Sequence, residues 1–193
     1  ATFRSDAEYS DGRHPDSVTF TDAREDAQRR DFTINGMFYD PLTDEYIDHV
    51  HGQADIEARL VRAIGEPEKR FAEDKLRLLR AVRFAASLQF RIEEATWAAI
   101  RQHADEITVV RAERILGELE KIIEHPERLE GLRLLRDSGL LAAILPELDS
   151  SDPASWTELE QTLDGIQSPP FPVVLAASWA TLAGETDLAA ACQ

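Results

Sequence analysis

The chain has 193 residues, a formal net charge of −16 and 43% hydrophobic residues. That length suffices for one domain or two small ones, and the acidic balance argues against a protein that coats nucleic acid non-specifically. The single cysteine, Cys192, cannot form an internal disulfide, which fits a reducing cytoplasm, and the longest apolar stretch, 173–183, is too short to span a bilayer.

Strand and turn signals are confined to the N-terminal part of the chain. Residues 17–21 alternate as a half-buried strand does, and residues 45–48 can return across a turn beside the apolar segment 34–39. From Asp55 onward strand signals are absent and the pattern predicts helices. The expected helices span about 53–63, 67–88, 93–106, 111–124, 126–138, 139–145, 154–166 and 172–183. The sequence therefore predicts an α+β protein, with a small mixed sheet followed by an all-α array.

The expected helix 67–88 is amphipathic. Four apolar residues recur at helical spacing and predict a buried face: Leu76, Leu79, Val82 and Ala86. The opposite face carries a carboxylate and three guanidinium groups at every third position: Asp74, Arg77, Arg80 and Arg83. Such a stripe rises about 4.5 Å per step, which makes it about as long as a nucleoside triphosphate. The alternative to a nucleotide-binding stripe is a solvated face of Asp–Arg pairs. The sequence also leaves open whether Asp74 caps a new helix, which would divide 67–88 into two helices.

The charge pattern supports a site for an anion in this region. Between Arg59 and Arg91 the sequence has nine Lys and Arg but only four Asp and Glu. A basic segment in an acidic protein favours a focused polyanion site over a broad RNA-binding surface.

Several motifs occur in an order that resembles a known family. The segment Arg29-Arg30-Asp31-Phe32-Thr33-Ile34-Asn35 is followed about forty residues later by Arg70-Phe71-x-Glu73-Asp74-x-x-Arg77-x-x-Arg80-Ala81-x-Arg83-Phe84. Between them lies Asp48-x-x-x-Gly52-x-x-Asp55-Ile56, which ends at Arg62, and after them comes Arg114-Ile115-x-x-Glu118-Leu119-x-Lys121. With residues 8–15, these motifs resemble the class II tRNA nucleotidyltransferase and bacterial poly(A) polymerase family over most of residues 1–148.

The resemblance implies roles for individual residues. Arg30 and Asp31 fall where the family contacts the sugar and phosphates of the incoming nucleotide, and Asp74 and Arg77 where it contacts the base edge of CTP or ATP. Arg80 and Arg83 match further arginines that contact the nucleotide, and they are expected to act through phosphate charge or by holding the helix. The implied nucleotide-binding residues are therefore Arg30, Asp31, Asp74, Arg77, Arg80 and Arg83. Phe84, beside this stripe, is interpreted as a packing residue rather than a platform for base stacking.

The resemblance also implies a domain organisation. Residues 1–52 correspond to the C-terminal part of a nucleotidyltransferase head domain, 53–148 to a helical neck, and 149–193 to the start of a helical body. The family holds two Mg²⁺ ions with a Gly-Gly-x-x-x-Arg-Asp stretch and an Asp-x-Asp pair, and neither occurs in this sequence. We therefore expect an internal fragment of a longer enzyme, with no catalytic or metal-binding carboxylates of its own. An incomplete sheet should leave an unpaired edge through which the chain can self-associate.

The leading hypothesis is a fragment of an enzyme that adds C and A to tRNA 3′ ends from CTP and ATP, with Mg²⁺. A-only addition or poly(A) synthesis is the alternative within the same family, because the same motifs serve all three activities. The alternative from another class is a non-catalytic module that binds RNA or nucleotides. An Asp-x-Asp strand encoded directly before Ala1 would favour the enzyme fragment over this module.

Overall fold

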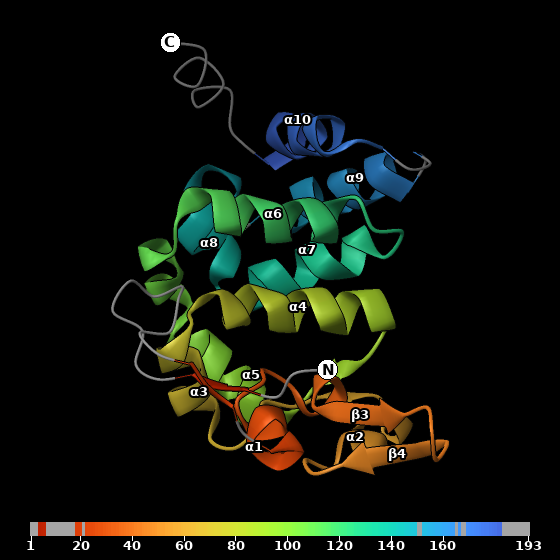
Figure 1. Ribbon diagram of the computed structural model, residues 1–193. Helices are drawn as coiled ribbons and strands as arrows, with labels where there is room; N and C mark the ends of the chain where they lie inside the picture. Colours follow the sequence, from red (N-terminus) through yellow and green to blue (C-terminus); the bar gives the residue numbers. More distant parts are fainter. Residues whose placement is uncertain are drawn as a thin grey trace.

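The computed structural model describes residues 4–6, 18–20, 22–149, 152–164, 166 and 169–182. Helices dominate this part of the chain, and its strands form short pairs (Figure 1). Among the residues that the structure describes, no helix is long and apolar enough to cross a membrane.

The N-terminal region combines strand pairs with short helices. It contains β1 (Arg4–Asp6), β2 (Val18–Phe20), α1 (Ala23–Gln28), η1 (Thr33–Asn35), β3 (Met37–Asp40), β4 (Glu45–Asp48) and α2 (Gly52–Glu57). β1 pairs antiparallel with β2, and β3 pairs antiparallel with β4, so that Met37 lies opposite Asp48. The predicted hairpin is thus confirmed. Ala27, Val50 and Ile64 are buried together, with Phe38 packed against them, and give this region a small core.

A third pair of strands differs from the prediction. The helix expected over 53–63 ends at Glu57, because Arg59 adopts a φ of 53°, a left-handed conformation through which a helix cannot continue. β5 (Leu60–Val61) then pairs in parallel with β6 (Arg91–Ile92). The expectation that no strand follows Asp55 is therefore wrong. Two residues are too few to show a strand period in the sequence, although Val61 is fully buried.

The expected helix 67–88 is divided into α3 (Pro67–Glu73) and α4 (Leu76–Leu88). Asp74 is extended, with φ −150° and ψ 106°, and its Oδ1 accepts the backbone N–H of Leu76 at 3.1 Å. A short polar side chain that accepts from the first turn of a helix compensates for a backbone donor without an intrahelical partner. The sequence left open whether 67–88 is one helix or two, and the structure shows two helices, with Asp74 capping the second.

The C-terminal part is helical, as predicted. It contains α5 (Glu94–Gln102), η2 (Ala104–Val109), α6 (Ala112–Ile123), α7 (Arg128–Asp137), α8 (Leu140–Ile144), η3 (Pro146–Leu148), α9 (Pro153–Asp164) and α10 (Phe171–Leu182). Each expected helix from residue 93 onward occurs, with its ends shifted by a few residues. The largest change affects 93–106, where the α-helix ends at Gln102 and the 3₁₀ helix η2 follows.

Helix α4 is the centre of the packing. It lies across the middle of the molecule, with α6 and α7 on one side and α3, α5 and the N-terminal region on the other (Figure 1). The predicted apolar face is confirmed: Leu76 is 7% exposed and Leu79, Val82 and Ala86 are 0–1% exposed. Because its apolar face is fixed against the core, α4 can present polar side chains from its first turns toward the N-terminal region.

Candidate functional site

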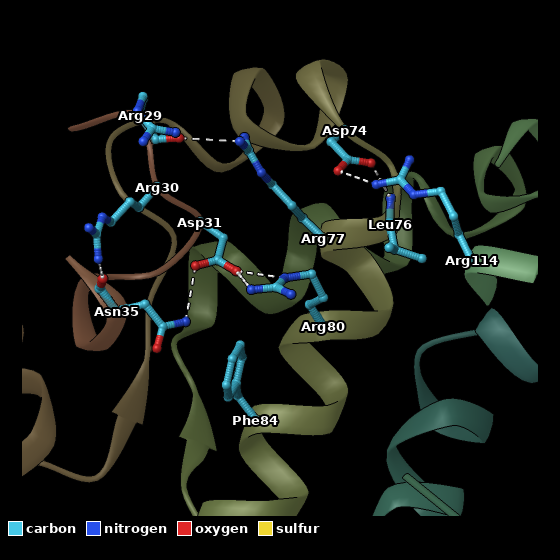
Figure 2. Close-up of a pocket in the computed structure, with 10 residues that line it drawn as sticks. All are labelled: Arg29, Arg30, Asp31, Asn35, Asp74, Leu76, Arg77, Arg80, Phe84 and Arg114. Atoms are coloured by element: carbon cyan, nitrogen blue, oxygen red, sulfur yellow. Dashed lines mark hydrogen bonds and ion pairs between the residues drawn. The ribbon is translucent and has the colours of Figure 1, made fainter. Parts of the chain in front are cut away.

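A cavity of about 470 Å³ lies between the loop after α1, the first turns of α4 and the start of α6 (Figure 2). Among the residues that the structure describes, ten line it: Arg29, Arg30, Asp31, Asn35, Asp74, Leu76, Arg77, Arg80, Phe84 and Arg114. The structure thus brings together five of the six residues implied by the sequence motifs, from segments more than forty positions apart. Arg83 is the one that does not line this cavity.

The loop after α1 is held in place by buried Asp26, which is 2% exposed. Arg30 donates through Nη2 to Asp26 Oδ2 at 2.9 Å and through Nη1 to the carbonyl oxygen of Asn35 at 2.8 Å. Arg29 donates through Nε to Asp26 Oδ1, also at 2.9 Å. The guanidinium of Arg30 also lies 4.7 Å from the ring centre of Phe38. Both arginines of the motif are therefore anchored to the same buried carboxylate.

Asp31 links this loop to α4. Its Oδ1 accepts the backbone N–H of Phe32 at 2.8 Å and Nδ2 of Asn35 at 3.0 Å, while Oδ2 accepts Nε of Arg80 at 2.7 Å. Burial alone would raise the pKa of Asp31, but the positive charge of Arg80 and these hydrogen bonds hold the pKa below its usual value. The carboxylate is therefore ionised at neutral pH and joins the loop to the second turn of the helix.

Asp74 and Arg77 both line the cavity at the start of α4, with Asp74 directed toward Arg114 and Arg77 toward Arg29 (Figure 2). Asp74 Oδ2 accepts Nη2 of Arg114 at 2.8 Å, in addition to the capping bond on Oδ1. Arg77 donates through Nη1 to the carbonyl oxygen of Arg70 at 2.9 Å and through Nη2 to that of Arg29 at 3.2 Å. A hydrogen-bond acceptor and a hydrogen-bond donor are thus both held in fixed orientations on one wall of the cavity.

Arg83 points to a different part of the molecule. Its Nε donates to Oε2 of Glu118 on α6 at 2.6 Å, and Lys121 donates to Oε1 of the same carboxylate at 2.9 Å. Glu118 is only 4% exposed. Burial alone would raise the pKa of Glu118, but the hydrogen bonds and charges of Lys121 and Arg83 keep it below its usual value. Arg83 therefore belongs to a buried ion pair between α4 and α6.

Phe84 forms an apolar wall of the cavity and also packs inward. Its ring meets that of Phe32 edge to face, with centres 5.8 Å apart. Arg83 lies 4.1 Å above the Phe84 ring centre. The expected packing contact exists, and the same side chain also borders the cavity.

Sequence reasoning assigned no nucleotide-binding role to several residues that line the cavity: Arg29, Asn35, Leu76 and Arg114. Arg114 stands four positions before Glu118, so both lie on the face of α6 that meets α4. Arg114 and Glu118 belong to one motif that the resemblance named without assigning roles to its residues, and that motif was the signal that could have drawn attention to Arg114.

The cavity is suited to an anion. Its lining includes five arginines and two aspartates, an excess of positive charge in a chain whose net charge is −16. Guanidinium forks bind phosphate and carboxylate oxygens in pairs, and a concave wall concentrates their field.

The described residues do not fit the metal site that the resemblance implies. Both cavity carboxylates are already bound by guanidinium groups, Asp31 by Arg80 and Asp74 by Arg114. Among the residues that the structure describes, no group of three or more His, Cys, Asp or Glu side chains lies where it could hold a metal ion.

The fold and the cavity define a class of protein: a small α+β head joined to a helical array, with an arginine-rich cavity at the junction. Two family models match the chain. "Poly A polymerase head domain" matches residues 1–62, and "Probable RNA and SrmB- binding site of polymerase A" matches residues 89–152.

Known proteins agree with these matches. The chain is 46% identical over 140 residues to the CCA-adding enzyme of Latilactobacillus sakei, a match that covers 72% of this chain and 35% of that enzyme. It superposes on the Bacillus stearothermophilus CCA-adding enzyme in complex with CTP with a TM-score of 0.70 and 31% identity, over 98% of this chain and 51% of that one. It also resembles a tRNA nucleotidyltransferase complexed with a primer tRNA and an incoming ATP analog, with a TM-score of 0.66 and 27% identity, over 75% of this chain and 43% of that one.

The chain belongs to the family of tRNA nucleotidyltransferases and bacterial poly(A) polymerases. It spans about a third of the length of the curated relatives it matches, as the 35% coverage of the L. sakei enzyme shows.

Proposed function

We propose that this chain is the nucleotide-selecting part of an enzyme that adds C and A to tRNA 3′ ends from CTP and ATP. One observation carries the proposal: the acceptor Asp74 and the donor Arg77 stand together on one wall of an arginine-rich cavity. The complexes of similar proteins with CTP, and with a primer tRNA and an ATP analog, support it. In this proposal residues 1–52 belong to a head domain, 53–148 to a neck and 149–193 to a body.

The base edge explains how protein side chains can choose C and A. Cytosine and adenine each present an amino group beside a ring nitrogen that accepts a hydrogen bond, so Asp74 accepts from the amino group and Arg77 donates to the ring nitrogen. Uracil and guanine present the inverse order, which places two acceptors or two donors against each other. A buried polar group without its partner costs about 1–3 kcal/mol, which is enough to reject the wrong base.

The remaining residues of the cavity have different roles. Arg30 lies beside the sugar and the phosphates. Asp31, whose oxygens already accept from Phe32, Asn35 and Arg80, orients Arg80, and Arg80 adds positive charge for the phosphates. Arg83 supports nucleotide binding by holding α4 against α6, since its guanidinium is engaged by Glu118.

In the whole enzyme, Mg²⁺ would activate the 3′-hydroxyl of the RNA and neutralise charge on the transferring phosphoryl group. We propose that its ligands belong to residues other than those described, whose cavity carboxylates are bound by arginines. The contribution of this chain is to bind and orient the incoming nucleotide.

Equilibrium binding tests the proposal directly. Isothermal titration of the 193-residue chain with CTP, ATP, UTP and GTP should show CTP and ATP bound at least about tenfold more tightly than UTP and GTP. Equal affinity for all four nucleotides would contradict it.

With the whole enzyme, a tRNA that lacks its entire CCA end separates CCA addition from A-only addition, because the second activity requires the two C residues to be present.

A second candidate within the family is poly(A) synthesis. The descriptions of both matching family models name poly(A) polymerase, which is the reason to consider it. An RNA that does not resemble tRNA discriminates between the two. A poly(A) polymerase should extend it with many A residues, whereas a CCA-adding enzyme should leave it unextended.

A further inference from the structure

The hairpin of β3 and β4 carries an exposed aromatic pair that the proposed function does not use. Tyr39 and Tyr46 lie directly opposite each other in the antiparallel register, with ring centres 5.1 Å apart and ring planes inclined by 44°. They are 50% and 67% exposed, and neither lines the arginine-rich cavity. Single exposed apolar side chains are normal on a protein surface, but rings in contact form a patch of the kind that partners bind.

The pleat of the strands explains why this pair faces outward. Side chains on a strand alternate between its two faces. Phe38, the neighbour of Tyr39, packs against the small core of the N-terminal region, with the guanidinium of Arg30 4.7 Å from its ring centre. Tyr39 and its cross-strand partner therefore belong to the opposite, outer face of the hairpin, which lies at the lower right of the molecule in Figure 1.

The turn of the hairpin holds the patch in a fixed shape. Tyr39 donates through its hydroxyl to Asp44 Oδ1 at 2.7 Å, which orients the ring. Asp40 Oδ1 accepts the backbone N–H of Leu42 at 2.9 Å, and Leu42 is 93% exposed at the tip. A surface that is already ordered loses little conformational entropy when a partner binds to it.

The hairpin is also strongly acidic. From Met37 to Asp48 the sequence has four carboxylates and no Lys or Arg. Asp40 and Glu45 are directly opposite each other in the register, and like charges in such positions destabilise a sheet. Asp44 adds a third charge at the same end, and one hairpin is narrower than the Debye length of about 8 Å at physiological salt. The turn end therefore keeps a concentrated negative potential at a cost in its own stability.

These charges select among the occupants of the patch. RNA and acidic lipid surfaces are anionic, and a second copy of the chain would bring the same carboxylates, so each would be repelled. A guanidinium group instead stacks on a tyrosine ring with its planar face and donates to a carboxylate at its edge. The hydroxyl of Tyr39 uses Oδ1 of Asp44, so Oδ2 keeps acceptor capacity for such a donor.

We propose that the outer face of the β3–β4 hairpin is a docking surface for an extended, arginine-bearing segment of a partner protein. Alternate side chains of an extended segment point to the same side about 6.6 Å apart, so arginines at alternate positions reach the tyrosine pair and the turn end together. The surface is small, which makes the interaction weak and transient. This docking goes beyond the proposed function and does not depend on it, because the hairpin residues do not line the cavity.

Isothermal titration of the 193-residue chain with the peptide Arg-Thr-Arg-Thr-Arg, blocked at both ends, measures the interaction. The control peptide has citrulline in place of arginine, which keeps the length and shape of the side chain without its charge. The arginine peptide should bind at least about tenfold more tightly than the citrulline peptide. Equal affinity for the two peptides would overturn the proposal.

Two variants locate the binding on the hairpin. Tyr46→Leu keeps an apolar side chain but removes the aromatic face, and should weaken the arginine peptide about two- to fivefold. Asp44→Asn removes one charge, while asparagine tolerates the φ of 58° and still accepts the Tyr39 hydroxyl; it should weaken the peptide about twofold. The matched control is Glu120→Gln, which removes an exposed charge from α6 and should keep the affinity.

Glu45→Gln separates a docking role from a structural one. It removes the repulsion between Glu45 and Asp40, so the urea midpoint of the free chain should rise while the arginine peptide binds about twofold more weakly. A carboxylate that served only the fold would lower the midpoint when it is removed. A lower midpoint, or an unchanged peptide affinity, would overturn the proposal.

Other outcomes identify other occupants. If Glu120→Gln weakens the peptide as much as Asp44→Asn does, the peptide responds only to net charge and the docking surface is overturned. If Tyr46→Leu leaves peptide affinity unchanged but reduces binding of a polyuridine RNA, or self-association in sedimentation, the patch serves RNA or a second copy instead. None of these results changes the nucleotide titration, so this proposal and the proposed function can fail separately.

Discussion

Two arginines of α4 that stand three positions apart, Arg80 and Arg83, belong to different environments. Arg80 lines the cavity and pairs with Asp31 of the loop after α1, with its side chain 32% exposed. Arg83 pairs with Glu118 of α6 and is 17% exposed. The first arginine joins the helix to the N-terminal region, and the second joins it to the helical array. Residues of one type at a regular spacing therefore need not share a function.

The helix geometry explains the difference. Every third residue of an α-helix turns by about 300°, so a stripe at this spacing moves backward around the axis by about 60° at each step. Between Arg77 and Arg83 the change is about 120°, which carries the third arginine from the cavity wall to the α6 interface. The length of the stripe suits a nucleotide, but its rotation does not allow all four residues to face one.

The largest effect should follow from breaking the ion pair between Arg83 and Glu118 at the α4–α6 interface. Glu118→Ala removes the carboxylate that Arg83 and Lys121 share, and leaves Arg83 without a counter-charge against α6. Loss of one partner from a buried ion pair costs about 3–5 kcal/mol, and the solvent access of Lys121 suggests the lower end of that range. Urea unfolding should show a large fall in midpoint with little change in slope.

The control for this variant is Arg133→Ala, which breaks the exposed pair between Arg133 and Glu160. Exposed pairs contribute about 0–1 kcal/mol, so its midpoint should scarcely move. Equal shifts in the two variants would show that the α4–α6 ion pair contributes no more than a surface pair.

Parts of the fold were predictable from sequence because they depend on local patterns. The apolar spacing of Leu76, Leu79 and Val82 predicted the buried face of α4, and Asp74 was recognised as a possible cap. The β5–β6 pair and the contact of Arg114 with Asp74 were not predicted. Both join segments about thirty or more positions apart, and a single sequence carries no local signal for such contacts.

In the candidate site, too, some features were predictable from local sequence patterns and others depended on long-range contacts. The motifs identified five residues that line the cavity, but they placed Arg83 with them. The partner of Arg83 decided its place, since Glu118 is a buried carboxylate that requires a counter-charge. Residue type and spacing thus indicated the chemistry of the site, and packing determined which side chains belong to it.

The next largest effect should follow from changes in the cavity, at Asp74 and Arg77, which we propose read the base. Asp74→Ala and Arg77→Ala should each relax the preference for CTP and ATP over UTP and GTP by roughly ten- to a hundredfold, because one base contact gives about 1–3 kcal/mol of discrimination. Competition binding to the chain, or relative incorporation by the whole enzyme, measures the ratio. Unchanged ratios in Asp74→Ala would remove its base-reading role, and the wall would then be a solvated face of ion pairs.

Arg80→Ala should have a smaller effect of a different kind. It removes positive charge from the cavity and the partner of Asp31, so all four nucleotides should bind about tenfold more weakly with their preference order kept. The loss should shrink at high salt, because screening reduces the contribution of a partly exposed charge. Titrations at two salt concentrations test both points. A change in preference larger than the change in affinity would place Arg80 at the base instead.

The smallest effect is a pH dependence of stability that the Arg80–Asp31 and Arg83–Glu118 pairs share. The folded-state pKa values of Asp31 and Glu118 lie below their usual values of 3.8 and 4.5. Burial raises each pKa, but the partners of each carboxylate outweigh burial. These partners are Arg80 and Asn35 for Asp31, and Lys121 and Arg83 for Glu118. A carboxyl whose pKa is lower in the folded state stabilises the protein above its unfolded pKa. This stabilisation is lost as the pH falls through the folded value.

Between pH 7 and pH 5.5 these two groups should therefore contribute a constant stability, and below about pH 4.5 the free energy of unfolding should decline. Other carboxyls titrate in the same range, so the readout is the difference between the unmodified chain and Asp31→Asn or Glu118→Gln at each pH. Neither amide can titrate, so each variant should be less stable at neutral pH but should lose less stability on acidification. Parallel curves would mean that the ion pairs with Arg80 and Arg83 do not stabilise the folded state.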